Sequence, residues 1–188
     1  MTKYDIAITL FTIVYGLMLT DLFLSFHKMI RARAKITWHW LPLLAAWYLF
    51  LIILKNWWDL AFFQGSADWM NILFFLAYGH LLLIIFLLVS TALPDDILTD
   101  KVDLKTYYFS NNSYFWGLMS AVIFISVIIS TLKQLNFMDS MNTYNLVANF
   151  IFFVLTVTLA ITKKYRVHAF LVIFFVAGVI LEILNKAI

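Results

Sequence analysis

The chain has 188 residues, of which 64% are apolar and 12% are charged, and its formal net charge at pH 7 is +3. Soluble domains are about 45–50% apolar and about 25% charged, so the composition excludes a soluble globular protein and predicts an integral membrane protein. The absence of cysteine excludes disulfides, thiolate metal sites and cysteine nucleophiles. The small net charge gives no reason to expect a nucleic-acid partner.

Six apolar runs, separated by polar breaks, predict an all-α bundle of six transmembrane helices. The runs cover residues 6–27, 38–62, 69–93, 114–132, 144–162 and 168–185, which together make one transmembrane domain over residues 1–188. The first run begins so close to Met1, without a small-residue cleavage pattern, that we expect the first span to be retained. The predicted helix boundaries are Thr37, Gly65–Ser66, Asn112–Ser113 and Asp139–Ser140 at starts, and Pro94 at the end of the third helix.

Lysine and arginine are distributed unevenly between the connections. Nine of the 13 lie in the first, third and fifth connections, three lie on the opposite side at Lys3, Lys133 and Lys186, and Lys55 lies within a span. This bias predicts that the first, third and fifth connections are cytoplasmic and that both termini are outside. Tryptophans support these borders, with Trp38 and Trp40 at the inner edge and Trp57, Trp58 and Trp69 at the outer edge.

The third connection is the only one with room for structure of its own. Its acidic beginning, followed by apolar residues between charged ones, predicts a short interfacial helix over 95–109, with an irregular linker as the alternative. Together with the basic first connection it is the best cytoplasmic docking surface in the chain. The docking candidates are Arg31, Arg33, Lys35, Tyr107 and Tyr108.

Ionisable residues within apolar spans are costly and are therefore the first functional candidates. Asp21 lies about two turns from the cytoplasmic end of the first span, and His80 lies near the middle of the third. Asp21 is interpreted either as a cation- or proton-binding carboxylate or as a structural partner of another helix. His80 is interpreted either as a proton relay or as a histidine hydrogen-bonded to a neighbouring helix.

Other polar residues are candidates for lining a path across the bundle. Glu182 lies near the outer end of the last span, and Asn145 and Asn149 form an i, i+4 pair in the fifth. Lys55 and Asp59 are also four residues apart, which predicts local charge pairing along one helix. The four histidines do not have the spacing of a metal or haem site, so we expect no metal and no cofactor.

Several short motifs carry a resemblance to a known class. They are Tyr15-Gly16-Leu17 followed by Asp21-Leu22, then Asn56-Trp57-Trp58, Leu93-Pro94-Asp95, Tyr107-Tyr108, and Tyr114-Phe115-Trp116-Gly117-Leu118. Over about residues 1–120 the chain resembles a widespread class of small uncharacterised bacterial multi-pass membrane proteins. The resemblance implies a six-helix protein of the bacterial inner membrane, and it carries no activity over to this chain.

The sequence carries none of the motifs of metallopeptidases, serine hydrolases, nucleotide-binding loops or potassium-channel filters, so we expect no enzymatic activity. Membrane-buried ionisable groups without catalytic motifs favour a homo-oligomeric ion channel or membrane-permeability effector. The alternative is a non-conducting sensor or anchor that recruits a cytosolic protein. A small-molecule transporter or lipid-modifying enzyme is the third possibility.

Overall fold

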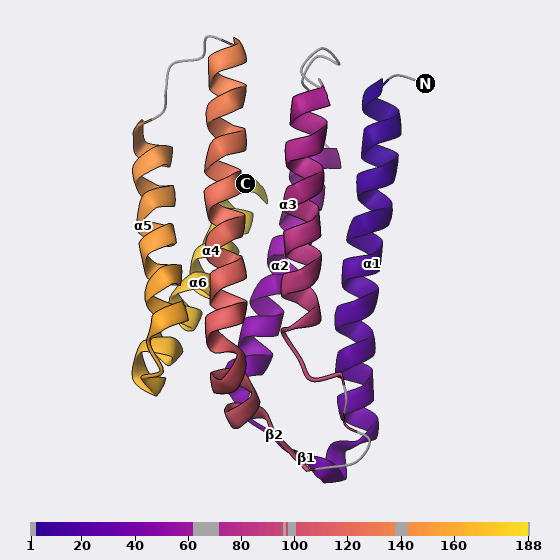
Figure 1. Ribbon diagram of the computed structural model, residues 1–188, viewed down its shortest axis with the longest axis vertical. Helices are drawn as coiled ribbons and strands as arrows, with labels where there is room; N and C mark the ends of the chain where they lie inside the picture. The colour runs from indigo at the N-terminus through magenta and orange to yellow at the C-terminus, as the bar shows by residue number, and fades with distance from the viewer. Residues whose placement is uncertain (1–2, 62–71, 96, 98–100, 138–142, 188) are drawn as a thin grey trace.

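A computed structural model describes residues 3–61, 72–95, 97, 101–137 and 143–187. The described residues form six α-helices, which run up and down in turn, so that the connections after α1, α3 and α5 lie at one end of the molecule (Figure 1). The helices are α1 (Lys3–Arg31), α2 (Trp40–Ala61), α3 (Ile72–Ser90), α4 (Leu104–Phe137), α5 (Thr143–Ile161) and α6 (Tyr165–Ala187). The all-α fold class is therefore confirmed.

Four helices are long and apolar enough to cross a membrane: Asp5–Arg31, Trp40–Leu60, Leu104–Ile129 and Tyr165–Asn185. The apolar stretches of α3 and α5 are shorter, at Phe75–Ser90 and Val147–Ile161. Several apolar helices of this length are typical of a multi-pass membrane protein. Helix α1 extends beyond the predicted run 6–27, with Asp5 in its first turn and Lys28 and Arg31 in its last, where these charges complement the helix dipole.

The helices form two layers (Figure 1). Helices α1, α3, α4 and α5 contact one another in that order along one layer, and α2 contacts α6 in the layer behind. Contacts of α1 and α4 with α2, and of α5 with α6, join the layers. Large side chains fill the space between them, including Met18, Leu49, Ile85, Trp116 and Phe175, each no more than 1% exposed.

The third connection differs from its prediction. Its described part contains no separate interfacial helix, because residues 104–109 are the first turns of α4. Just before them β2 (Val102–Asp103) pairs in parallel with β1 (Ile36–Thr37) of the first connection, joining Ile36 to Val102 and Thr37 to Asp103. The backbone hydrogen bonds of this segment are thus made with the first connection rather than within an amphipathic helix.

Two predicted helix starts are wrong for related reasons. Helix α4 begins ten residues before the predicted position 114, because the Oδ1 atom of Asp103 accepts a hydrogen bond from the Thr106 amide at 2.8 Å and caps the helix. Thr37 belongs to β1, and α2 begins after His39, whose Nδ1 accepts from the Leu41 amide at 3.3 Å. The predicted boundaries at Gly65–Ser66, Trp69 and Asp139–Ser140 lie outside the described residues.

Candidate functional site

One face of α3 is exposed along its length and carries a single ionisable side chain. Its exposed positions follow alternating steps of three and four residues, the spacing with which a helix packs against another along one seam. We call Leu73, Leu76, His80, Leu83 and Leu87 the α3 seam. The leucines of this seam are between 39% and 69% exposed, and His80 lies among them at the ninth of the 19 positions of α3.

Hydrogen bonding fixes the tautomer of His80. Its Nδ1 lies 2.7 Å from the carbonyl oxygen of Leu76, and a carbonyl only accepts, so Nδ1 carries the proton and donates it. In the neutral ring Nε2 is then an acceptor, and none of the residues that the structure describes donates to it. Hydrocarbon offers no donor to such an atom, whereas water or a partner protein does.

Asp21 lies close to the end of α1 in a polar cluster with residues of the third connection. The buried Ser25 hydroxyl contacts both the Asp21 carbonyl, at 3.0 Å, and the Oδ1 atom of Asp95. The Lys28 ammonium lies 3.3 Å from the same Asp95 oxygen. The Asp21 side chain itself is half-buried one turn before Ser25, so the cluster places two carboxylates and one ammonium where the last third of α1 meets the third connection.

Glu182 lies at the opposite end of the molecule from this cluster. Its carboxylate is 3.0 Å from the Lys55 ammonium, which also lies 3.3 Å from Asp59. The predicted Lys55–Asp59 pairing is confirmed, and Glu182 extends it into a bridge between α2 and α6. Asn149 is half-buried on α5, and Asn145 lies on the same helix, with a side chain outside the described part of the structure.

The predicted docking residues are not all at the surface. Arg31, Arg33 and Lys35 are exposed at the end where the first and third connections lie. The Tyr107 hydroxyl donates to the Thr91 carbonyl at 3.2 Å, which ties α4 to the end of α3. Tyr108 is only 6% exposed, so its side chain belongs to the interior and not to a docking surface.

Tyr108 is part of a hydrogen-bonded chain that the sequence did not indicate. His168 Nε2 lies 2.8 Å from the Thr162 carbonyl and must donate to it, which leaves Nδ1 as acceptor for the Tyr108 hydroxyl at 2.9 Å. The Tyr108 oxygen in turn accepts from Trp116 Nε1 at 3.0 Å. Trp116 and His168 are fully buried, and this directed chain holds His168 neutral while fastening α4 to α6.

Asn112 is another residue whose role the sequence did not indicate. Its Nδ2 donates to the carbonyls of Leu159 and Thr162 at 3.1 and 3.0 Å, which are among the groups that a helix end leaves without partners. The Ser113 hydroxyl donates to the Ala160 carbonyl at 2.8 Å. These two residues were predicted to start α4, and instead they cap the end of α5 from within α4. The Oδ1 atom of Asn112 is buried without a partner among the described residues.

No group of three or more histidine and acidic side chains within the described ranges is placed to hold a metal ion. Comparison with protein-family models, curated proteins and solved structures gives no match to this chain. The features of the described residues that bear on function are the α3 seam, the Asp21 cluster and the basic end of the bundle.

Proposed function

We propose that the protein is a homo-oligomeric membrane channel whose subunits pack through the α3 seam and whose His80 side chains lie in the conducting path. The observation that carries this proposal is the free Nε2 acceptor of His80 in the middle of an exposed apolar stripe. A second copy packed along the stripe buries the leucines, and the histidines of neighbouring subunits then face one another or a shared column of water.

The histidine ring suits proton transfer. Its two nitrogens can accept a proton on one side and donate a proton on the other, so the ring can pass a proton along a column of water. The leucines on either side of His80 form apolar rings in such an assembly, and narrow apolar rings exclude water and act as gates. The proposed activity is a pH-dependent proton or cation conductance, with Asp21 as the cation-binding carboxylate near the cytoplasmic mouth.

Flux through purified full-length protein in liposomes tests the conductance. We expect wild-type protein to carry protons and His80→Gln, whose amide forms hydrogen bonds but transfers no proton, to fall to the level of empty liposomes. His27→Gln removes another exposed histidine, on α1, and serves as the matched control. We expect Asp21→Asn to change the rate or selectivity of cation passage. Equal flux through wild type and His80→Gln would contradict the proposal.

Cross-linking tests the assembly separately. Because the chain has no cysteine, Leu83→Cys introduces a single thiol into the seam, where a disulfide forms only if two Cα atoms come within about 7 Å. Phe124→Cys on α4 is a matched control, since Phe124 is 56% exposed and Leu83 is 57% exposed. We expect oxidation to give a covalent dimer of the first variant only, and monomers of both would rule out packing through α3.

The channel proposal includes a topology. All six helices cross the membrane of a bacterial cell, the inner membrane in a cell with two, with both termini outside and the basic connections in the cytoplasm. Two observations support it: the helices alternate in direction, and the connections after α1, α3 and α5 share one end of the bundle (Figure 1).

A non-conducting sensor or anchor is the second candidate. It is favoured by the exposed Arg31, Arg33 and Lys35 beside β1, because the pairing with β2 holds this basic cluster in place for an acidic cytosolic partner. Charge reversal by Arg31→Glu with Arg33→Glu should remove partner contacts in a cross-linking experiment on native membranes. An unchanged set of cross-linked proteins would eliminate this candidate.

A further inference from the structure

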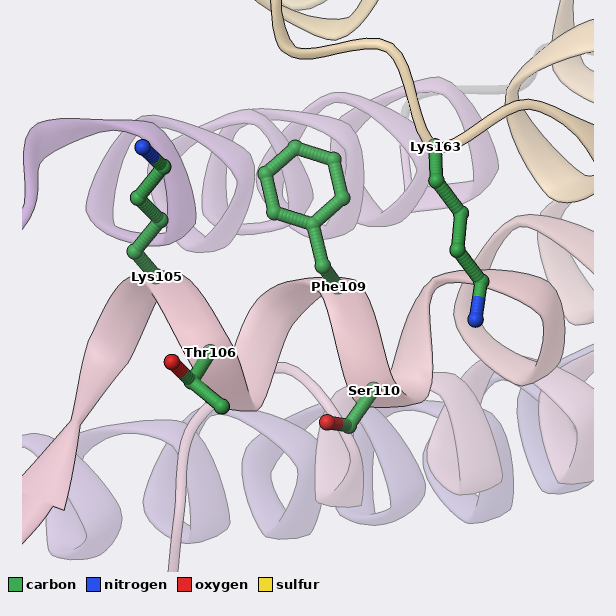
Figure 2. Close-up of a pocket in the computed structure, with 5 residues that line it drawn as sticks. All are labelled: Lys105, Thr106, Phe109, Ser110 and Lys163. Carbon is green, nitrogen blue, oxygen red and sulfur yellow. The ribbon is translucent and has the colours of Figure 1, made fainter.

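A shallow pocket of about 460 Å³ opens at the basic end of the bundle, between the start of α4 and the connection from α5 to α6. Figure 2 shows its lining residues: Lys105, Thr106, Phe109, Ser110 and Lys163. Thr106 and Ser110 lie one turn apart on α4, and Lys163 extends from the connection towards that helix (Figure 2). The pocket thus combines side chains from two segments that are far apart in the sequence.

The lining residues have the chemistry of an anion site. Two ammonium groups and the Ser110 hydroxyl offer hydrogen-bond donors, and none of the five residues carries a carboxylate. The Thr106 hydroxyl is already hydrogen-bonded to the Asp103 carboxylate. Asp103 already occupies the Thr106 amide at the helix start. An anion in this pocket is therefore held by the side chains rather than by the helix terminus. A phosphate group, with several acceptor oxygens and a negative charge, matches this set of donors.

The surroundings of the pocket indicate the depth of lipid head groups. The Lys105 ammonium lies 5.0 Å from the centre of the Tyr165 ring, and Trp40 Nε1 donates to the Tyr165 hydroxyl at 3.1 Å. Tryptophan and tyrosine gather at the membrane–water interface, where their rings meet hydrocarbon and their polar atoms meet water. Phe109 adds an apolar wall to the pocket itself.

We propose that this pocket binds the phosphate of an anionic phospholipid of the cytoplasmic leaflet, with phosphatidylglycerol as the representative head group. Lys105 and Lys163 neutralise the phosphate, Ser110 donates a hydrogen bond to it, and Phe109 contacts the glycerol and upper acyl carbons. The site lies on α4 and the α5–α6 connection rather than on α3. A failure of conductance or of packing through α3 therefore leaves this proposal intact, whereas its choice of the cytoplasmic leaflet rests on the orientation proposed above.

Native mass spectrometry of the full-length protein tests the site by counting bound lipids. The probes are short-chain phosphatidylglycerol, short-chain phosphatidylcholine and inorganic phosphate. We expect the wild type to retain phosphatidylglycerol in preference to phosphatidylcholine. Each lysine near an anionic surface contributes about fivefold in binding, so Lys105→Ala with Lys163→Ala should weaken phosphatidylglycerol binding roughly 30-fold.

Two further variants separate a specific site from general charge. Lys164→Ala with Arg166→Ala removes the same charge from exposed positions of the same region and should leave binding unchanged. Lys105→Arg with Lys163→Arg keeps the charge and should retain most of the binding. Equal losses in both alanine pairs would overturn the site. Equal retention of the two lipids, or displacement of phosphatidylglycerol by inorganic phosphate at comparable concentration, would overturn the assignment to a lipid.

Discussion

Single polar side chains in this chain differ in whether they are satisfied internally. His168 and Thr156 are at most 1% exposed, and each donates to or accepts from a neighbouring helix or its own backbone. His80 is exposed at the middle of α3 with one nitrogen free. The two histidines therefore have opposite consequences: His168 holds helices of one subunit together, whereas His80 requires something outside it.

Removal of the Tyr108 hydroxyl tests the buried chain. In Tyr108→Phe the His168 Nδ1 acceptor and the Trp116 Nε1 donor both lose their partner in a dry interior, which costs about 1–3 kcal/mol for each group. We expect a lower melting temperature in detergent, followed by circular dichroism. Tyr114→Phe is the control, because Tyr114 is 52% exposed and its loss should change stability by less than about 0.5 kcal/mol. Equal melting of both variants would contradict this account.

The sequence could not distinguish these histidines by function. Hydropathy gives the depth of a residue along a helix, but it does not give the direction in which the side chain points around the axis. His80 stood out because it interrupts an apolar run, whereas His168 lies at the start of one. The partners of His168 come from α4 and from the end of α5, and only the three-dimensional packing brings them together.

At the scale of helices, the apolar runs located all six and gave both ends of α5 to within one residue, but they missed the start of α4 by ten residues. The long α4 shows why, since residues 104–113 are polar enough to read as a connection. They are helical because Asp103 caps the first turn, and because Tyr107, Tyr108 and Asn112 bond to the ends of α3, α5 and α6. Such tertiary hydrogen bonds override local composition, and a single-sequence pattern does not contain them.

The start of α4 should be sensitive to acid. The hydrogen bond from the Thr106 amide lowers the pKa of Asp103 below its usual value of 3.8. A carboxyl group with a lowered pKa stabilises the fold above that usual value, and the contribution is lost as the pH falls through the lowered pKa. At pH values below about 4, we expect the melting temperature of the wild type to fall by more than that of Asp103→Ser. The serine hydroxyl caps the helix without titrating. Parallel losses in the two proteins would contradict this role.

On the scale of the whole molecule, the order of helices in space was beyond the sequence. Composition and alternating direction are shared by many arrangements of six helices. The observed one places α3 between α1 and α4 and puts α2 and α6 behind them (Figure 1). This arrangement leaves one face of α3 uncovered, and it separates the Asp21 cluster from the Lys55–Glu182 bridge at the other end. This helix order does not favour a polar path within one subunit that is formed by Asp21, Asn145 and Glu182.

The proposed orientation can be tested by cysteine labelling, because a cysteine introduced into this chain is its single thiol. We expect a membrane-impermeant maleimide added to intact cells to label Asp5→Cys near the start of α1. Ala34→Cys and Lys164→Cys, in the first and fifth connections, should react only after the membrane is opened. Labelling of Asp5→Cys and Ala34→Cys from the same side would contradict a membrane crossing by α1.

The pairing of β1 with β2 also orders events during biosynthesis. Its two strands are 66 residues apart, since Ile36 pairs with Val102. At about 5–20 residues per second, roughly 3 to 13 seconds of translation pass between the two strands. During this interval α2 and α3 are synthesised, while the first connection has no strand partner. The synthesis of residue 103 therefore completes β2, which can then pair with β1 after α1, α2 and α3 have been made. The same residue, Asp103, caps the start of α4.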